Sequence, residues 1–288
     1  MKKILVTGAN SYVGTSFEKW LSQWPDKYHV DTIGMIDGLW REKPFAEYDV
    51  VFHVAGIAHV SADPSKKEMH YKINRDLAIE TAEKAKSDGV KQFIFMSSMI
   101  IYGADEPVGK EKIITKETQP APADFYGDSK LQADLAIQKL ADDNFIVSIM
   151  RPPVIYGPGC KGNFPKLLKL AKYALIFPNI ENRRSMIYID NFTECVRLII
   201  DGMAGGIFFP QNEEYVATKD VIANYRKMTG KTTFIAPFPA VIAKTLSMNE
   251  SFKKAFGSKI YAKELSDCSR YNVVTFNEGI TRMVEDAR

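Results

Sequence analysis

The junction near the N-terminus constrains the fold more than any other part of the sequence. Ile4–Val6 is a continuous apolar run, as expected for a strand that is buried on both faces. The run leads into a turn that contains Gly8. Apolar residues then recur at helical spacing until Pro25 ends the pattern: Val13, Phe17, Trp20 and Leu21. A buried strand that feeds directly into a helix is the first half of a β-α-β unit, so we expect an α/β fold.

Further apolar runs repeat this arrangement along the first half of the chain. They predict strands at 32–36, 50–54, 93–96 and 145–150, and helices at 73–86, 126–140 and 191–201. Strands that alternate with helices of this length predict a Rossmann-type, doubly wound parallel sheet. We expect residues 1–155 to form this dinucleotide-binding core. Residues 156–288, where the alternation weakens, are expected to form mainly a smaller C-terminal substrate-binding lobe, with about 183–201 returning to the core.

Composition and charge exclude several classes of protein. The 288 residues are 45% hydrophobic, and a formal charge of +3 with scattered basic residues gives no reason to expect nucleic-acid binding. No apolar stretch approaches twenty residues and no signal peptide is recognisable, so we expect no membrane span and a cytoplasmic location. The three cysteines are widely spaced, and the histidines are dispersed, which predicts neither disulfides nor a metal site: His29, His53, His59 and His70. His53, inside a predicted strand, is expected to be a core histidine.

The first turn has the spacing of a phosphate-binding loop. Gly8, Ser11 and Gly14 lie three residues apart, where a helix N-terminus and its backbone amides can hold a pyrophosphate. The serine narrows the approach of a ligand to the backbone, although its hydroxyl can itself bond a phosphate oxygen. A tight turn that binds no ligand is the alternative interpretation.

The choice between NAD and NADP stays open at this stage. Asp37 is a candidate partner for the adenosine ribose. Gly34 occupies an equally suitable place, and an exposed turn explains Asp37 as well. Arg41 and Lys43 nearby can instead favour a 2′-phosphate. We expect NAD, with NADP not excluded.

A second group of residues indicates proton transfer. Tyr126 and Lys130 are four residues apart at the start of a predicted helix, so their side chains share one face. An adjacent ammonium is expected to lower the pKa of the phenol by favouring tyrosinate, which makes the pair a proton shuttle. Ser98 stands at the end of a predicted strand, where a doubly wound fold has its active-site crevice. These three residues are therefore predicted to be catalytic.

Five segments together resemble one family of enzymes. They are TGANSYVG at 7–14, VFHVAG at 51–56, FIFMSSMIIYG at 93–103, FYGDSK at 125–130 and RPPVIYGPG at 151–159. In this order they resemble the extended short-chain dehydrogenase/reductase family and, within it, the nucleotide-sugar epimerase/dehydratase branch. The resemblance implies an NAD(P)-dependent enzyme with a sugar-nucleotide substrate, and a homodimer.

The resemblance also implies roles for individual residues. In addition to Asp37, the expected cofactor-binding residues are Gly8, Ser11, Tyr12, Gly14, Ala55, Gly56, Asn74, Lys130 and Pro153. The implied catalytic residues are Ser98, Tyr126 and Lys130, and the implied substrate-binding residues are Ser98, Asn163 and Arg184. In the family an arginine at the place of Arg184 reaches the nucleotide diphosphate. A surface arginine paired with Glu181 is the alternative.

Three functions are compatible with these residues. The leading one is an NAD(P)-dependent nucleotide-sugar 4-epimerase that acts on a UDP-hexose through a 4-keto intermediate. The alternative is an NAD(P)H-dependent reductase of a 4-keto sugar nucleotide or a related carbonyl, and the third is a non-catalytic dinucleotide-binding sensor. A 4,6-dehydratase is not expected, because Met99 and Ile100 replace the acidic pair of that branch. The chain is also shorter than typical members of the branch, which leaves the identity of the sugar open.

Overall fold

The structure, a computed structural model, describes residues 1–58 and 63–286 and divides into two compact units. The first unit consists of Met1–Gly103, Gln119–Pro152 and Phe192–Pro210. The second unit consists of Ala104–Thr118, Pro153–Asn191 and Gln211–Arg288. The chain therefore passes between the units several times, and the first unit takes up residues from beyond position 190.

The first unit is built on a six-stranded sheet in which every pair is parallel, with the order β10-β6-β4-β3-β1-β2. Its strands are β1 (Lys2–Thr7), β2 (Tyr28–Ile33), β3 (Val50–His53), β4 (Gln92–Met96), β6 (Ile146–Met150) and β10 (Gly206–Phe208). The chain starts in β1, adds β2 on one side and then builds outward on the other side. The strand order thus reverses between β1 and β3, where folds of this kind bind their ligands. The predicted Rossmann-type, doubly wound parallel sheet is confirmed.

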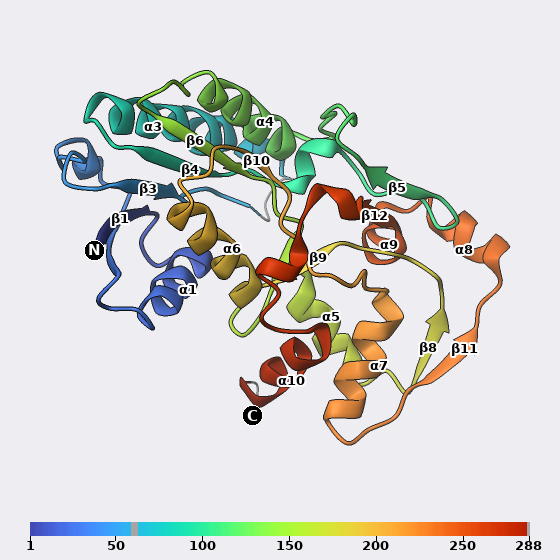
Figure 1. Cartoon of the computed structure of the whole chain (residues 1–288). Coiled ribbons are helices and arrows are strands. Elements are labelled where there is room, and N and C mark those ends of the chain that lie inside the picture. The colour runs from blue at the N-terminus through green and yellow to red at the C-terminus, as the bar shows by residue number, and fades with distance from the viewer. Residues whose placement is uncertain (59–62, 287–288) are drawn as a thin grey trace. The chain divides into compact units, whose positions relative to one another are not determined.

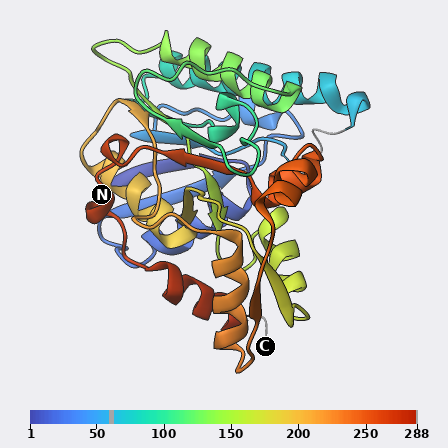
Figure 2. The ribbon, with the colours of Figure 1, turned by 90° about the vertical axis from the view of Figure 1, so that its right-hand side faces the viewer.

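Helices cover both faces of this sheet. They are α1 (Tyr12–Leu21), α2 (Lys67–His70), α3 (Leu77–Ser87), α4 (Phe125–Gln138) and α6 (Ile189–Asp201). Helices α3 and α4 lie on one face, whereas α1 and α6 lie on the other (Figure 1). Figure 2 shows the same order edge-on, with green α4 above the strands and gold α6 below them. The face under α3 and α4 buries a large apolar cluster that includes Leu5, Val51, Phe93, Ala82 and Ile137.

Two predicted elements differ from the observed ones. The second strand is Tyr28–Ile33 rather than 32–36. It is an edge strand that pairs only with β1, so it is half exposed and tolerates polar residues that hide the apolar pattern. The predicted helix at 73–86 begins instead as a π-helical segment at Tyr71–Asp76 and continues as α3. Three-residue and four-residue 3₁₀ turns occur at Leu39–Arg41, Pro64–Lys66 and Met99–Tyr102.

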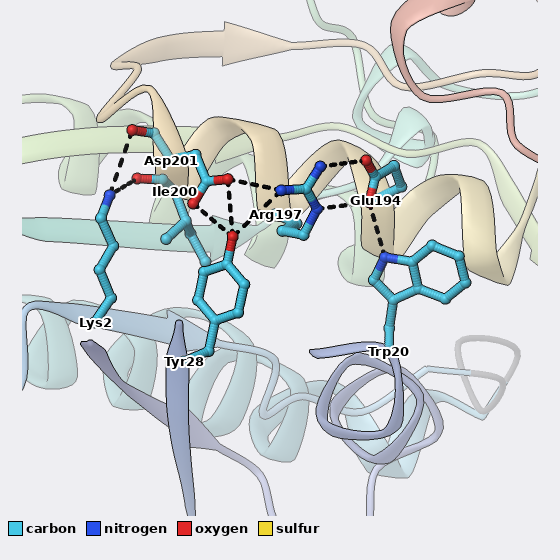
Figure 3. A network of polar contacts seen from close by, with 7 residues as sticks. All are labelled: Lys2, Trp20, Tyr28, Glu194, Arg197, Ile200 and Asp201. Atoms are coloured by element: carbon cyan, nitrogen blue, oxygen red, sulfur yellow. Dashed lines mark hydrogen bonds and ion pairs between the residues drawn. The ribbon is translucent and has the colours of Figure 1, made fainter. Parts of the chain in front are cut away.

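A polar network joins the C-terminal part of α6 to α1 and β2 (Figure 3). Arg197 donates to Glu194 at 2.5 Å and to Asp201 at 2.7 Å, so one guanidinium joins two carboxylates. Trp20 on α1 donates to Glu194 at 2.9 Å, and Tyr28 at the start of β2 donates to Asp201 at 2.7 Å. This network, together with the pairing of β10 and β6, holds residues 192–210 to the rest of the first unit.

The second unit contains three pairs of short parallel strands and several helices. The pairs are β5 (Glu111–Ile114) with β12 (Ser258–Tyr261), β7 (Val154–Tyr156) with β9 (Met186–Tyr188), and β8 (Ile176–Asn179) with β11 (Phe234–Pro237). The helices are α5 (Asn163–Ala171), α7 (Thr218–Met228), α8 (Ala240–Leu246), α9 (Glu250–Phe256) and α10 (Phe276–Asp286), with 3₁₀ turns at Lys263–Leu265 and Cys268–Arg270. Its core contains stacked aromatic rings, such as Tyr156 on Phe164 with centroids 4.8 Å apart. That this unit binds the substrate stays a prediction.

Candidate active site

Two glycines in the turn between β1 and α1 stand where the backbone packs tightly. Gly8 has a φ of +97°, and a Cβ there would lie 2.9 Å from the backbone of Ala55. A Cβ at Gly14 would lie 2.7 Å from Oγ of Ser11. Glycine at these two positions therefore lets the turn pack closely on residue 55 and lets α1 begin directly after it, so that the unpaired amides of the helix start lie at this turn.

Ser11 has a structural task in this loop. It is the N-cap of α1, and its Oγ accepts the backbone N–H of Gly14 at 3.1 Å. Because the oxygen accepts, the hydroxyl proton can still be donated to an anion. Tyr12 is the first residue of α1, where the unpaired amides and the helix dipole favour negative charge. The residues of the loop thus fit the pyrophosphate of a dinucleotide.

Asp37 lies beyond the end of β2 on an exposed turn. Its Oδ1 accepts the backbone N–H of Leu39 at 3.1 Å, which stabilises the 3₁₀ turn that follows. Arg41 donates to Glu80 at 2.6 Å. Asp37 therefore lies on an exposed turn, as the alternative interpretation expects. Its role at the adenosine ribose stays a prediction.

Further predicted cofactor-binding residues lie just beyond the end of β3: Ala55, Gly56 and Asn74. Asn74, in the π-helical segment, is fully buried. Its Oδ1 accepts the backbone N–H of Ile57 at 2.9 Å and its Nδ2 donates to the Ile57 carbonyl at 3.0 Å. A Cβ at Gly56 would lie 3.0 Å from Asn74 Oδ1 and 3.2 Å from Lys130 Nζ. Ala55 adjoins Gly8, so the structure brings the predicted residues of the phosphate loop, of 55–57 and of α4 together.

The three predicted catalytic residues come from adjacent elements. Ser98 follows β4, and its hydroxyl forms a hydrogen bond with Tyr126. Tyr126 is the second residue of α4, which Asp124 caps by accepting the Gly127 N–H at 2.8 Å. Lys130, one turn later, is buried and donates to the Met96 carbonyl at 2.7 Å. The cap and the strand end therefore place the three side chains near the carboxyl end of β4.

Burial shifts the pKa values of both titratable members of this group. It raises the pKa of Tyr126 to about 12, whereas the hydrogen bond with Ser98 lowers it. Burial lowers the pKa of Lys130 to about 8, and the Asp134 carboxylate opposes this shift. The net shift of Tyr126 is thus opposite to the one expected from the sequence, because the loss of solvent outweighs favourable partners. Near neutral pH Tyr126 is a phenol and can donate a proton.

A buried ion pair that the sequence analysis missed lies behind this group. Arg151, just after β6, donates two hydrogen bonds of 2.9 Å to Asp134 on α4. Ser97 donates to the same carboxylate at 2.6 Å, and Arg151 donates to the hydroxyl of Tyr102 at 2.7 Å. The pair thereby connects the ends of β4 and β6 with the helix that carries Tyr126. Its sequence signal is the position of Asp134 one turn beyond Lys130.

His53 lies in the interior, as expected for a core histidine. It is fully buried in β3, its Nδ1 is 2.8 Å from Oγ1 of Thr7, and its ring stacks on Phe93 and Phe95. Burial lowers the pKa of His53 to about 3, so the ring is neutral. Within 1–58 and 63–286, no group of three or more His, Cys, Asp or Glu side chains is arranged to hold a metal ion. His59 lies outside the described residues.

The predicted residues of the second unit have three different environments. Pro153 is buried next to β7, and Asn163 is exposed as the first residue of α5. Arg184 donates to Asp105 at 2.6 Å and to the Gly257 carbonyl at 3.1 Å. Glu181, the alternative partner of Arg184, pairs instead with a lysine of α7. Arg184 is therefore a mostly buried arginine held within its own unit.

No helix among the residues that the structure describes has the length and apolar character needed to cross a membrane.

Comparison with known proteins identifies the family. Residues 4–208 match the NAD dependent epimerase/dehydratase family. A UDP-glucose 4-epimerase from Vibrio cholerae is 31% identical over 262 residues, which are 83% of this chain and 79% of the relative. The UDP-glucuronic acid 4-epimerase from Bacillus cereus, solved in complex with NAD, superposes with a TM-score of 0.74 at 19% identity over 99% of this chain and 96% of that one. The dTDP-4-dehydrorhamnose reductase from Bacillus anthracis, in complex with NADP, has a TM-score of 0.74 at 16% identity over 100% of both chains. As the sequence motifs predicted, the chain belongs to the NAD-dependent epimerase/dehydratase family of enzymes.

Proposed function

We propose that the protein is an NAD-dependent nucleotide-sugar 4-epimerase that acts on a UDP-hexose through a 4-keto intermediate. One observation carries this proposal: Ser98 and Tyr126 are hydrogen-bonded, and Lys130 lies one turn further along the same helix. The similarity to the Vibrio cholerae UDP-glucose 4-epimerase over most of both chains supports this reaction and this substrate class.

The residues around the β1–α1 turn would hold the cofactor. The amides at the start of α1 and the hydroxyl of Ser11 would bind the pyrophosphate, and Asn74 would fix the segment beside Gly56. NAD, when bound, supplies the hydride acceptor and donor for the reaction. The proposed cofactor-binding residues are Gly8, Ser11, Tyr12, Gly14, Asp37, Ala55, Gly56, Asn74, Lys130 and Pro153.

The three catalytic residues would transfer the proton of the sugar 4-hydroxyl. Tyr126 exchanges a proton with the 4-oxygen of the sugar, and Ser98 holds that oxygen by a hydrogen bond. Lys130 contributes positive charge, which favours tyrosinate when the proton is taken from the 4-hydroxyl. Loss of the hydroxyl proton to Tyr126 and of the C4 hydride to the bound cofactor would give the 4-keto sugar. Return of the hydride to the opposite face of C4, with return of the proton to the oxygen, would give the 4-epimer.

Arg184 and Asn163 would bind the nucleotide diphosphate and the sugar nucleotide. In the structure a carboxylate, that of Asp105, already accepts from the guanidinium of Arg184. Arg184 therefore has the geometry for an anion, and the diphosphate would compete with Asp105 for it.

The alternative function is a reductase of a 4-keto sugar nucleotide, and one observation favours it. Burial holds Tyr126 as a phenol near neutral pH, which is the form that donates a proton to a ketone under reduction. The fold is shared with the Bacillus anthracis reductase as well as with the epimerase. The reductase needs the same three catalytic residues in one direction only.

The assembly and location of the protein are also inferred. We infer a homodimer, and exposed apolar side chains such as Leu135 on α4 and Met69 on α2 support a contact surface there. We infer a cytoplasmic enzyme, since the thiols of Cys160, Cys195 and Cys268 are buried and form no disulfide in the part of the chain that the structure describes. Light scattering on the purified chain tests the homodimer.

The deciding experiment is incubation of the purified protein with UDP-galactose without added cofactor, followed by anion-exchange chromatography. Formation of UDP-glucose supports the epimerase, because it requires a retained cofactor and a ketone that stays in the site. Absence of conversion, with stoichiometric NAD(P)H consumption on a 4-keto sugar nucleotide, overturns the epimerase in favour of the reductase. Activity that persists undiminished in Tyr126→Phe overturns the proton shuttle in either case.

A further inference from the structure

His70 is a buried histidine that the proposed reaction does not yet use. It ends α2, immediately before the π-helical segment, and is fully buried. Two aromatic rings of α4 pack edge-to-face with its imidazole. The imidazole centroid lies 5.0 Å from the ring centroid of Phe125 and 5.6 Å from that of Tyr126. His70 therefore packs directly against the proposed proton donor.

The hydrogen bond of His70 determines which ring nitrogen carries the proton. Its Nδ1 lies 3.1 Å from Nδ2 of Asn74. An amide nitrogen only donates, so Nδ1 accepts and the neutral ring carries its proton on Nε2. Its Nε2 has no hydrogen-bond partner among the described residues. The ring is thus held by one acceptor contact and by aromatic packing.

The same contact orients the amide of Asn74. With Nδ2 shared between His70 and the Ile57 carbonyl, Oδ1 is left to accept the N–H of Ile57 at 2.9 Å. A flipped amide would place its oxygen against two acceptors and its NH₂ against a donor. The two hydrogen bonds with the Ile57 backbone, which we call the Asn74 clamp, require this amide orientation, and neutral His70 adds a third contact that is compatible only with it.

We propose that neutral His70 is a positioning residue that links the Asn74 clamp on Gly56 and Ile57 to the ring of Tyr126. The imidazole of His70 then contacts both Asn74, which holds the proposed cofactor-binding segment at 56–57, and Tyr126, the proposed proton donor, and so fixes their relative positions. This inference rests on the proposed function for the role of Tyr126 as proton donor. The hydrogen bonds of Asn74 with Ile57 and His70 are observed contacts and do not depend on that function.

Charge around His70 supports its neutral form. Burial lowers the pKa of His70, the Asp124 carboxylate opposes that shift, and the Lys130 ammonium adds to it. Protonation would place an N–H on Nδ1 directly against the donor of Asn74, and the clamp would open. The clamp should therefore weaken as the solution becomes acidic.

Two substitutions separate the two contacts. His70→Asn keeps an acceptor near the place of Nδ1 but loses the ring, whereas His70→Phe keeps the ring but loses the acceptor. His29→Phe is the matched control, because His29 is half exposed on β2. The readouts are the dissociation constant of NAD for protein stripped of nucleotide, the exchange rate of the Ile57 amide, kcat, and the melting temperature.

We expect His70→Phe to weaken NAD binding about tenfold, the effect of one lost hydrogen bond, and to speed exchange at Ile57. His70→Asn should retain NAD affinity, lose the acid-dependent weakening of NAD binding seen in the parent, and lower kcat. The proposal is overturned if His70→Phe binds NAD as the parent does, or if both variants lose affinity only in proportion to their melting temperatures. NAD affinity and Ile57 exchange test the clamp even in a protein that turns over no sugar nucleotide, so failure of the proposed function is distinguishable.

Discussion

Lys130 and Asp134 lie one turn apart on the buried side of α4, and the carboxylate of Asp134 opposes the fall in pKa that burial imposes on Lys130. Asp134 is itself held by two hydrogen bonds from Arg151. The proposed catalytic lysine and the ion pair that connects β6 to α4 therefore share one electrostatic environment.

Removing the charge of Asp134 should be strongly destabilising. In Asp134→Asn the guanidinium of Arg151 stays buried without its counter-ion, which should lower the free energy of unfolding by about 3–5 kcal/mol. Asp76→Asn breaks the exposed pair with Arg75 and should cost no more than about 1 kcal/mol. Urea unfolding of both variants measures the difference. Equal costs would contradict the expectation that a buried Arg151 without its counter-ion destabilises the fold more than an exposed arginine does.

The stability contribution of Lys130 should depend on pH in a defined window. Its pKa in the folded protein is about 8, below the ordinary value of 10.5, so between these values the unfolded chain binds more protons. The unfolding free energy should therefore rise as the pH increases from 8 to 10.5, by roughly 2–3 kcal/mol.

Lys130→Met provides the comparison, since it removes this titration and leaves the other groups in place. The difference in unfolding free energy between the parent and Lys130→Met should increase in favour of the parent across that window. A difference that is flat from pH 8 to 10 would show that the pKa of Lys130 is not depressed.

Loss of the Tyr126 hydroxyl should abolish most catalysis without loss of structure. Tyr126→Phe keeps the ring against His70 but cannot exchange a proton, so kcat should fall by about 10²–10⁴-fold. The melting temperature and the affinity for NAD should stay close to those of the parent. Tyr173→Phe, which alters an exposed tyrosine of the second unit, is the control and should retain full activity.

Replacement of Gly8 in the phosphate loop should be destabilising for two reasons, namely its positive φ and the close approach of the Ala55 backbone. Gly89→Ala places a side chain at a φ of +82° with open space around it, and should cost about 1–2 kcal/mol. Gly8→Ala adds a contact of 2.9 Å with the backbone of Ala55 to a similar φ, and should cost roughly 1–3 kcal/mol more. Chemical denaturation compares the two.

Gly8→Ala should also lose NAD binding, which Gly89→Ala should retain. Calorimetric titration with NAD measures this directly. A Gly8→Ala protein that is folded and still binds NAD with the affinity of the parent would contradict the proposed role of the loop.

Local sequence patterns were sufficient for the sheet, its main helices and the family, because each depends on residues close together in the chain. The apolar run before Gly8, the Tyr126 and Lys130 spacing and the strand end at Ser98 were all predicted from such patterns. The edge strand β2 was misplaced, since an edge strand that is half exposed lacks a continuous apolar run.

Only the tertiary structure decided what surrounds these residues. Burial, which no local pattern measures, raises the pKa of Tyr126 where a neighbouring lysine alone predicts a decrease. His70 and Arg151 reach the site through contacts with residues far along the chain, namely Tyr126 and Asp134. The sequence by itself therefore determined the family and the identity of the proposed catalytic residues. Folding determined their protonation and their support, because desolvation and long-range contacts exist only after the chain has packed.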